Sequence, residues 1–400
     1  MNRFILLFVF LVTFLHSDIL TGLDIIQRDD FKLLHNQNIG LVVNHTSLNK
    51  NGVHILDLLL EYKNINVVSI FTPEHGLKGN FSAGEEINSS FDENSGIKII
   101  SLYGKKKQPT TDDLLGLDYI VFDIQDIGSR YYTYVSTLTY ILKASSMAEI
   151  PVIILDRPNP LGRKIEGPII DSKYYSFVGM HPIPIRHGLT IAELALMING
   201  EGWLSSQNKA EIIIYEMENW NSDLGYFSIS PSPNIPDFST AFIYNGMCLL
   251  EGTNISEGRG SSAPFLLFGA PWMNSKLILE DMLKFNSPGV TFYQKTFKPI
   301  SMEGAKHPKY KGELCYGIKI DVFDESAMDP LAISILTLKT IYKHHPNYFS
   351  FNNNNFIAKL YGSNKIKENI LQDRSIQELI NTWNNDAISF SLLRKPYLIY

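Results

Sequence analysis

The sequence predicts an α/β fold in which a doubly wound, mainly parallel sheet is followed by a smaller α+β domain. From Gly22 to about Asn221, strand-like runs alternate with helix-like runs. The strand-like runs are continuously apolar, which is typical of parallel strands covered on both faces. Short β-α-β spacing favours right-handed crossovers, so we expect a Rossmann-like sheet. The alternation ends after Trp220, which indicates a second domain.

Polar side chains follow four apolar runs at the point where each predicted strand ends. The runs are 39–43, 67–71, 119–122 and 152–155, and they lead into Asn44-His45, Glu74-His75, Asp123 to Asp126, and Asp156 to Asn159. The carboxyl ends of parallel strands form the edge where α/β proteins bind ligands. One such strand end would mean little, but four indicate the rim of an active site.

Three segments between the strands are predicted to be helices. Residues 53–62 and 131–148 carry apolar side chains at helical spacing. A third helix begins at Thr190 and runs through Met197, because Thr190 and Glu193 have the spacing of a capping box. Glu193 is therefore assigned to the cap and not to catalysis.

The proline-rich stretch 228–236 divides the chain. Its three prolines exclude a regular helix or a central strand, so we expect a linker that also lines the cleft. A chain of 400 residues is longer than one core usually serves. We therefore expect one domain over 22–241 and a second over 242–400. In the second domain, 317–322 is a predicted strand and 352–355 a polar loop.

Charge and the N-terminal segment limit the classes of function. The net charge is −6 and the pI is about 5.9, so we expect no nucleic-acid partner and no attraction to anionic lipid. Residues 1–17 have the pattern of a secretory signal peptide: Asn2-Arg3, an apolar run too short to span a membrane, and the small Ser17. We expect export to the periplasm or outside the cell, with no membrane contact after cleavage. An uncleaved anchor is the less favoured alternative.

Two cysteines, Cys248 and Cys315, occur in the chain. An exported protein can pair them, but two buried thiols are slightly favoured. Two cysteines are too few for a cysteine-based zinc site, and no His-Glu-x-x-His motif occurs.

Glu74 and His75 are the leading catalytic candidates. Pro73 and Gly76 flank them and restrict the backbone to a stiff turn at the end of a strand. Partial burial would raise the pKa of Glu74 and suit its carboxyl to general acid catalysis. The alternative is a carboxylate that caps a helix, and we favour the catalytic interpretation.

A second group of candidates contains Asp123, Asp126, Arg130 and Tyr132. The planar fork of an arginine suits a carboxylate ligand. Two structural interpretations are equally compatible with the sequence: Arg130 pairs with Asp123, or Asp126 caps the following helix. Tyr132 is a candidate ring for stacking on a sugar.

The rigid turn 156–162 offers three substrate-binding candidates. Its two prolines exclude helix. Asp156, Arg157 and Asn159 carry groups that bond to hydroxyls, although an internally satisfied turn explains Asn159 well.

Two further segments offer candidates for substrate binding. Arg186 and His187 lie directly before the capped helix. In the second domain, Glu251 to Gly260 interleaves polar residues with glycines, which permits close approach to a ligand. Its candidates are Asn254, Glu257 and Arg259. A Gly-x-Gly-x-x-Ala pattern in this region is not a dinucleotide fingerprint, because a proline follows and no helix begins there.

These segments together carry a family resemblance. In chain order they are Asn44-His45-Thr46, Phe71-Thr-Pro-Glu-His-Gly76, Phe122-Asp-Ile-Gln-Asp126, Arg130 with Tyr132-Thr-Tyr134, Leu155-Asp-Arg-Pro-Asn-Pro-Leu-Gly162, Glu166-Gly-Pro168, Pro184-Ile-Arg-His-Gly188 and Gly252-Thr-Asn-Ile-Ser-Glu-Gly-Arg-Gly260. The chain resembles the exo-β-N-acetylmuramidases of the NamZ type over nearly everything after residue 17. Many motifs match in order, so the resemblance is specific.

The resemblance implies a Rossmann-like domain, a smaller C-terminal domain and an active site in the cleft between them. It also implies release of terminal N-acetylmuramic acid from the non-reducing end of peptidoglycan-derived disaccharides and glycan chains. Glu74 is then the general acid, with His75 tuning it. The second carboxylate is left open among Asp123, Asp126 and Glu257, and the acetamido group of the substrate is an alternative nucleophile.

The resemblance also bears on specificity and cofactors. Arg130, Arg186 and Arg259 are candidates for the lactyl carboxylate that distinguishes muramic acid from N-acetylglucosamine. The expected chemistry requires neither a metal nor a nucleotide cofactor. One departure concerns residues 261–266, where the family usually shows threonines and then Arg-Pro-Phe-Glu. This chain has Ser-Ser-Ala-Pro-Phe-Leu, so an arginine and a carboxylate are missing.

Two rival functions remain open from the sequence. The first is a non-catalytic exported sugar-binding protein, which needs no carboxyl of raised pKa. The second is a metal-dependent hydrolase that uses Glu74, His75, His181 and His187.

Overall fold

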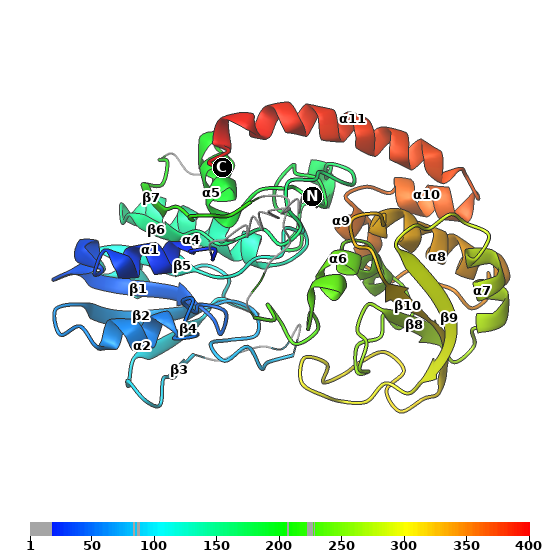
Figure 1. The fold of residues 1–400 in the computed structure, drawn as a ribbon, viewed down its shortest axis with the longest axis horizontal. Coiled ribbons are helices and arrows are strands. Elements are labelled where there is room, and N and C mark those ends of the chain that lie inside the picture. Colours follow the sequence, from blue (N-terminus) through cyan, green and yellow to red (C-terminus); the bar gives the residue numbers. More distant parts are fainter. Residues whose placement is uncertain (1–17, 83–84, 86–88, 206–207, 222–226, 228) are drawn as a thin grey trace, which may run out of the picture.

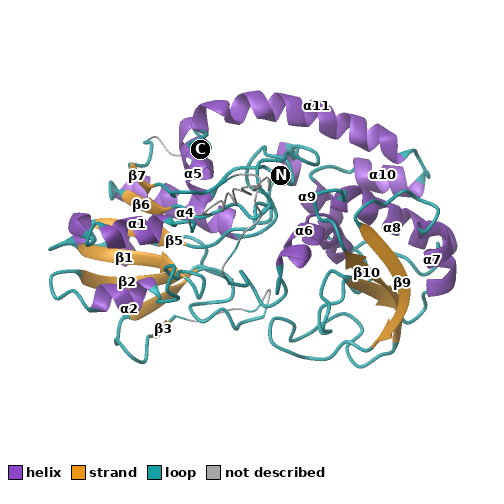
Figure 2. Ribbon diagram, in the orientation of Figure 1, coloured by secondary structure: helices purple, strands orange, loops and turns teal. Residues whose placement is uncertain are grey.

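The computed structural model describes residues 18–82, 85, 89–205, 208–221, 227 and 229–400. The expected signal peptide, 1–17, and Ser228 of the expected linker lie outside these residues. The α/β prediction is confirmed: a large, mostly parallel sheet with helices is joined to a smaller part with an antiparallel sheet (Figures 1 and 2).

The described residues form a first sheet of seven strands in the order β3-β4-β2-β1-β5-β6-β7. The strands are β1 (Asn38–Val43), β2 (Asn66–Thr72), β3 (Ser90–Phe91), β4 (Lys98–Ser101), β5 (Tyr119–Asp123), β6 (Val152–Leu155) and β7 (Ile212–Tyr215). All pairings are parallel except that of β3 with β4 at one edge. The chain adds strands on one side of β1 and then on the other. The direction therefore reverses between β1 and β5, where a Rossmann-like sheet usually binds its ligand.

Helices cover both faces of this sheet. They are α1 (Gly22–Arg28), α2 (Ile55–Leu60), α3 (Thr111–Leu114), α4 (Tyr134–Ala148) and α5 (Ile191–Gly200). The helix expected at 53–62 is α2, which is shorter at both ends, and the helix expected at 131–148 is α4, which begins three residues later. The capping box of α5 is confirmed, since the Thr190 amide donates to Glu193 and the Glu193 amide donates to Thr190.

The strands show why both faces must be covered. In β5, Val121 packs with α1 and α2 on one face, whereas Ile120 and Phe122 pack with α3, α4 and α5 on the other. Alternate residues of β6 divide in the same way. Successive side chains of a strand point to opposite faces, so these continuously apolar strands bury both.

The C-terminal part contains a three-stranded antiparallel sheet of order β8-β10-β9 among the described residues. Its elements are α6 (Phe238–Met247), the 3-10 helix η3 (Cys248–Gly252), β8 (Leu267–Ala270), α7 (Ser275–Met282), β9 (Val290–Phe297), β10 (Cys315–Val322), α8 (Pro330–His344), α9 (Phe356–Tyr361), α10 (Lys365–Leu371) and α11 (Ile376–Arg394). The expected domain boundary at 241/242 falls inside α6. Cys248 and Cys315 are free, buried thiols, as favoured from the sequence.

The end of the chain returns to the first sheet. Helix α11 runs above both parts and brings the C-terminus back beside α5 (Figure 1). There the Arg394 guanidinium donates to the carbonyls of His187 and Gly188, and the Tyr400 hydroxyl donates to Asp156 at 2.9 Å. No helix in the described part of the chain is long and apolar enough to cross a membrane.

Arg130 joins the two parts at a second place. Its guanidinium is buried and donates to the carbonyls of Pro168 and Ile183 in the first part, and to those of Leu360 and Tyr361 in the second, at 2.7 to 2.9 Å. Burial lowers its pKa to about 10. Four backbone carbonyls accept from its two terminal nitrogens, so the role of Arg130 is structural. It neither pairs with Asp123 nor lines the cleft.

Replacing Arg130 with lysine should therefore destabilise the protein by ~2 kcal/mol or more. A lysine ammonium has three donors and no planar fork, so it leaves buried carbonyls unpaired. Denaturant unfolding measures the effect. Arg28→Lys is the control: Arg28 pairs with Glu218 at the exposed surface, where such pairs contribute little. Equal unfolding midpoints for the two variants would contradict the role given to Arg130.

Candidate active site

A cavity of about 270 Å³ lies between the two parts of the chain. Glu74 and His75 line it from the first part, and Glu251 and Arg259 line it from the second. Its aromatic lining consists of Tyr103, Tyr131, Tyr132, Phe177, Tyr244, Phe265 and Phe356. The described part of the predicted linker contains no helix or strand and contributes Ser232, Asn234 and Ile235 to the lining. A larger cavity of about 620 Å³, between α7, α8 and α11, is lined by none of the predicted site residues.

Glu74 reaches this cavity from a turn at the end of β2. The Gly76 amide closes the turn on the Pro73 carbonyl at 3.1 Å, and no helix begins at Glu74 itself. The carboxylate of Glu74 is half-buried and accepts a hydrogen bond from the Thr133 hydroxyl at 2.8 Å. Thr133 is the residue before α4, so the first turn of that helix orients the carboxylate.

His75 is held in an unusual backbone conformation. Its φ is 73°, in the left-handed region that few non-glycine residues adopt. Its ring is buried, and Nδ1 lies 2.6 Å from the Phe81 carbonyl oxygen. Strained residues of this kind often occur at functional sites, and here the strain places an imidazole in the cavity wall beside Glu74.

Glu251 is the carboxylate that the sequence analysis did not select. It lies in η3, and its Oε1 accepts from Arg259 Nη2 at 2.6 Å. Burial raises the pKa of Glu251, while the guanidinium of Arg259 opposes that rise. The segment 251–260 was recognised as a loop built for close approach. Glu251 is the first residue of that segment, and this position could have identified it as a candidate site residue.

A second cavity of about 430 Å³ adjoins the first and shares Glu251 and Arg259 with it. Its further lining includes Glu257, Lys306 and Lys309. Lys309 lies 3.0 Å from the Glu257 carboxylate and also donates to two backbone carbonyls. Of the predicted residues of the second domain, Arg259 therefore lines both cavities and Glu257 only the second. Asn254 lines neither, because its side chain is bonded to the backbone of Tyr348 and Ser350.

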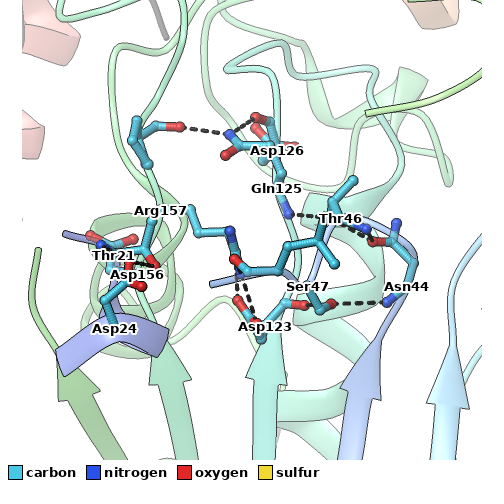
Figure 3. A network of polar contacts seen from close by, with 12 residues as sticks. Thr21, Asp24, Asn44, Thr46, Ser47, Asp123, Gln125, Asp126, Asp156 and Arg157 are labelled. Carbon is cyan, nitrogen blue, oxygen red and sulfur yellow. Dashed lines mark hydrogen bonds and ion pairs between the residues drawn. The ribbon is translucent and has the colours of Figure 1, made fainter. Parts of the chain in front are cut away.

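Asp123 and Arg157 fill the point where the sheet reverses direction. Their side chains form a buried ion pair, with Arg157 Nη2 at 2.8 Å from Asp123 Oδ2. The Ser47 hydroxyl donates to the Asp123 carbonyl (Figure 3). Arg157 also donates to the Leu48 carbonyl. The usual ligand crevice of the fold is thus filled by the protein's own side chains. Neither Asp123 as a catalytic residue nor Arg157 as a substrate ligand fits these contacts.

Asp126 is buried and does not reach the cavity that Glu74 lines. Its Oδ2 accepts from the Gly128 amide at 2.7 Å. Burial raises its pKa to about 7. His187 Nε2 is 4.0 Å away, too far for a hydrogen bond, and burial lowers the pKa of His187 to about 3. Neither residue lines the cavity.

The other candidates from the strand ends are also held by the protein itself. Asn44 donates to the Tyr134 hydroxyl at 3.0 Å, and His45 Nε2 lies 2.9 Å from the Ser230 carbonyl oxygen. Asp156 accepts from the Ala192 amide at 3.0 Å. Asn159 accepts from the Leu161 amide at 2.9 Å, which is the internally satisfied turn considered from the sequence.

Arg186 and Tyr132 complete the comparison. Arg186 pairs with Glu166 at 2.9 Å and bonds to the Leu161 carbonyl, away from the cavity that holds Glu74. Tyr132 lines that cavity, with its ring packed edge-on against Tyr134 at a centroid distance of 4.7 Å. Tyr132 therefore keeps its predicted place at the site, and Arg186 does not.

The residues of the metal-hydrolase alternative are not gathered in one place. His181 stacks on Trp203 and contacts Thr139, and His187 lies beside Asp126, whereas Glu74 and His75 line the cavity. Over the described ranges, no cluster of three or more His, Cys, Asp or Glu side chains is arranged to hold a metal ion.

Two carboxyl groups in an aromatic pocket fit a glycosidase, because carboxyl pairs cleave glycosidic bonds and aromatic rings pack against sugars. Family models agree with this class. Exo-β-N-acetylmuramidase NamZ, N-terminal, matches residues 39–239, and the C-terminal model of the same family matches 242–400. The chain belongs to the NamZ family of exo-β-N-acetylmuramidases.

Individual relatives support the same conclusion. The chain is 38% identical over 386 residues to the peptidoglycan β-N-acetylmuramidase NamZ of Bacillus subtilis (strain 168), covering 95% of this chain and 91% of that protein. Two crystal structures of DUF1343 family proteins from Bacteroides fragilis NCTC 9343 share the fold. One has a TM-score of 0.86 at 30% identity, and the other 0.80 at 34%; each match covers 96% of this chain and 99% of the other.

The departure at 261–266 lies mostly outside the pocket. Phe265 lines the cavity, but the positions of the missing arginine and carboxylate are Ala263 and Leu266, which line neither cavity. Ala263 packs against Leu267, Phe297 and Cys315 instead. The lining that contains Glu74 and Glu251 is therefore built without those two side chains.

Proposed function

We propose that this protein is an exported, exo-acting glycoside hydrolase that releases terminal β-1,4-linked N-acetylmuramic acid from the non-reducing end of peptidoglycan fragments. The observation that carries the proposal is that Glu74 and Glu251, one from each part of the chain, line one aromatic cavity. Family membership supplies the reaction, and the cavity supplies the carboxyl groups that the reaction requires.

The size of the cavity supports action at a chain end. At about 270 Å³ it is smaller than the roughly 300–1,000 Å³ pockets that hold drug-sized ligands. A terminal sugar fits such a space, whereas several consecutive sugars need an open groove. The adjoining cavity of about 430 Å³ offers room for a substituent or for the next sugar.

Glu74 is assigned as the general acid. Its proton passes to the glycosidic oxygen as the bond from that oxygen to the anomeric carbon breaks, and the bonding electrons go to the departing oxygen. A water molecule then adds to the anomeric carbon and returns a proton to Glu74. The Thr133 hydroxyl fixes the direction of the carboxyl, and His75 stiffens the turn that carries it.

Arg259 is assigned to the lactyl carboxylate of muramic acid. Of the three arginines predicted for this role, Arg130 and Arg186 are committed to backbone carbonyls and to Glu166. Arg259 lines both cavities, and its buried Nε makes no hydrogen bond, with Glu257 Oε1 3.9 Å away. A buried donor of this kind suits an anionic group of the substrate.

Glu74→Gln should keep the fold and substrate binding but lower kcat on a β-N-acetylmuraminide whose leaving group needs a proton by about 10²–10⁴-fold, the usual contribution of a general acid. Turnover of the muraminide and of the matching N-acetylglucosaminide is measured with chelator present. Glu149→Gln, exposed at the far end of α4, is the control. Normal turnover by Glu74→Gln would remove Glu74 from its role. If the wild-type protein loses activity in chelator, the metal-dependent alternative is favoured. If the wild-type protein binds the muraminide but does not turn it over, the sugar-binding alternative is favoured.

Arg259→Met should reduce the preference for the muraminide over the N-acetylglucosaminide at least tenfold. Hydrogen bonds to charged groups contribute about 1.5–3 kcal/mol, and ~1.4 kcal/mol is a factor of ten. The ratio of the two kcat/KM values is the measurement, because general damage to the site lowers both. Arg374→Met, at an exposed position, is the control. An unchanged ratio would exclude Arg259 from recognising the lactyl group.

Export is proposed from the signal-peptide pattern of residues 1–17. We expect the mature protein to begin directly after Ser17 and to be found outside the cytoplasm. N-terminal sequencing of the protein recovered from fractionated cells measures this. An intact N-terminus in the cytoplasmic fraction would contradict it.

A further inference from the structure

We infer that Glu251 is the second catalytic carboxylate, whose ionised form faces the anomeric carbon while Glu74 protonates the leaving oxygen. This inference rests on the proposed function and adds to it a residue that the sequence analysis did not select. Its basis is the position of Glu251 in the cavity wall and the charged groups that surround it.

Position decides between Glu251 and the other acidic candidates. Among the described residues, Glu74 and Glu251 are the carboxylates in the lining of the aromatic cavity. Asp123 is bound in a buried ion pair with Arg157, and Asp126 accepts from the Gly128 amide and does not line the cavity. Glu257 faces the second cavity and Lys309. A carboxylate must reach the sugar to act on it, and Glu251 meets this requirement.

The two carboxyl groups come from different parts of the chain and line the same cavity. Glu74 follows β2 of the large sheet, and Glu251 lies in η3 directly after α6 of the C-terminal part. They are near enough that the charge of Glu74 raises the pKa of Glu251. A sugar in the cavity therefore meets both carboxyl groups, and glycoside cleavage uses such a pair.

Arg259 fixes Glu251 and favours its ionised form. The bond from Arg259 Nη2 to Glu251 Oε1 is 2.6 Å long. The charged and titratable groups that act on Glu251 or respond to its charge are Arg259, Lys309, Glu257, Glu74, Cys248, Tyr244 and Tyr131. Arg259 and Lys309 favour the carboxylate, whereas burial, Glu257 and Glu74 disfavour it, and the pKa is raised on balance.

The assigned step balances in atoms and charge. As the glycosidic bond breaks, its electrons go to the leaving oxygen, which takes the Glu74 proton. Positive charge develops at the anomeric carbon, and the Glu251 carboxylate stabilises it. Water then adds to that carbon and gives one proton to Glu74. The ionised form of Glu251 is unchanged over the cycle, whether the acetamido group of the sugar takes part or not.

Two substrates separate the roles of the two carboxyl groups. In a dinitrophenyl β-N-acetylmuraminide the leaving group departs without a proton, whereas the natural disaccharide requires one. Glu74→Gln should keep much of its activity on the dinitrophenyl substrate and lose it on the disaccharide. Glu251→Gln should lose at least about a hundredfold on both, because charge at the anomeric carbon develops with either. Glu280→Gln, exposed on α7, should match the wild type on both.

A second variant and the pH profile cover a failure to fold. Glu251→Asp keeps the carboxylate but moves it away from the sugar, because the side chain is one methylene shorter. This variant should fold and still lose rate on both substrates. Protonation of Glu251 should set the acid limb of kcat/KM. Removing the cation in Arg259→Met raises the pKa of Glu251 further, so the acid limb should move to higher pH.

The outcomes are distinct. Wild-type turnover of both substrates by Glu251→Gln, or full activity of that variant on the dinitrophenyl substrate alone, would overturn the inference and leave the muramidase proposal intact. An acid limb that stays in place in Arg259→Met would also overturn it. If the wild-type protein turns over neither the disaccharide nor the dinitrophenyl muraminide, the proposed function is overturned and the inference with it.

Discussion

The active site depends on the buried guanidinium of Arg130. Its donors join the carbonyls of Pro168 and Ile183 to those of Leu360 and Tyr361, and the last two residues lie 230 and 231 positions after Arg130 in sequence. The next residues, Tyr131 to Thr133, line the cavity, and Thr133 orients Glu74. A cavity with one carboxyl from each part of the chain is useful only if the two parts keep a fixed distance. The Arg130 bonds provide that constraint, and the return of α11 and Tyr400 to Asp156 adds to it.

The filled switch point explains why the site lies where it does. In a doubly wound sheet the crevice between the strands that diverge is the usual ligand site. Here the Asp123–Arg157 ion pair occupies it, with Ser47 and Thr46 bonded around it (Figure 3). A buried ion pair is costly to separate, because each charge then lacks its partner. The open space therefore lies to one side, at the end of β2, where the C-terminal part forms the opposite wall.

The sequence could predict the fold because strand burial and helix capping are local signals. Apolar runs identified the central strands, and the Thr190–Glu193 pattern located the start of α5. Glu74 was found because Pro73 and Gly76 restrict the turn around it. The sequence could not separate ligand-binding from structural polar residues at the strand ends. Arg130, Arg157 and Arg186 find their partners through tertiary contacts, and spacing along the chain does not encode these. Glu251 was missed for the same reason, since only folding places it opposite Glu74.

Cationic and acidic side chains both surround Glu251, and they act on its pKa in opposite directions. A carboxylate that stabilises a developing cation must be ionised, yet burial in an aromatic pocket favours its neutral form. Arg259 and Lys309 oppose that effect, and Glu257 balances the second of these cations through its own ion pair. Removing either cation would favour the protonated acid, whereas removing burial would admit water that weakens every interaction in the pocket. The two cations thus limit the rise that burial causes in the pKa of Glu251, and they come from the segment 251–260 and from Lys309.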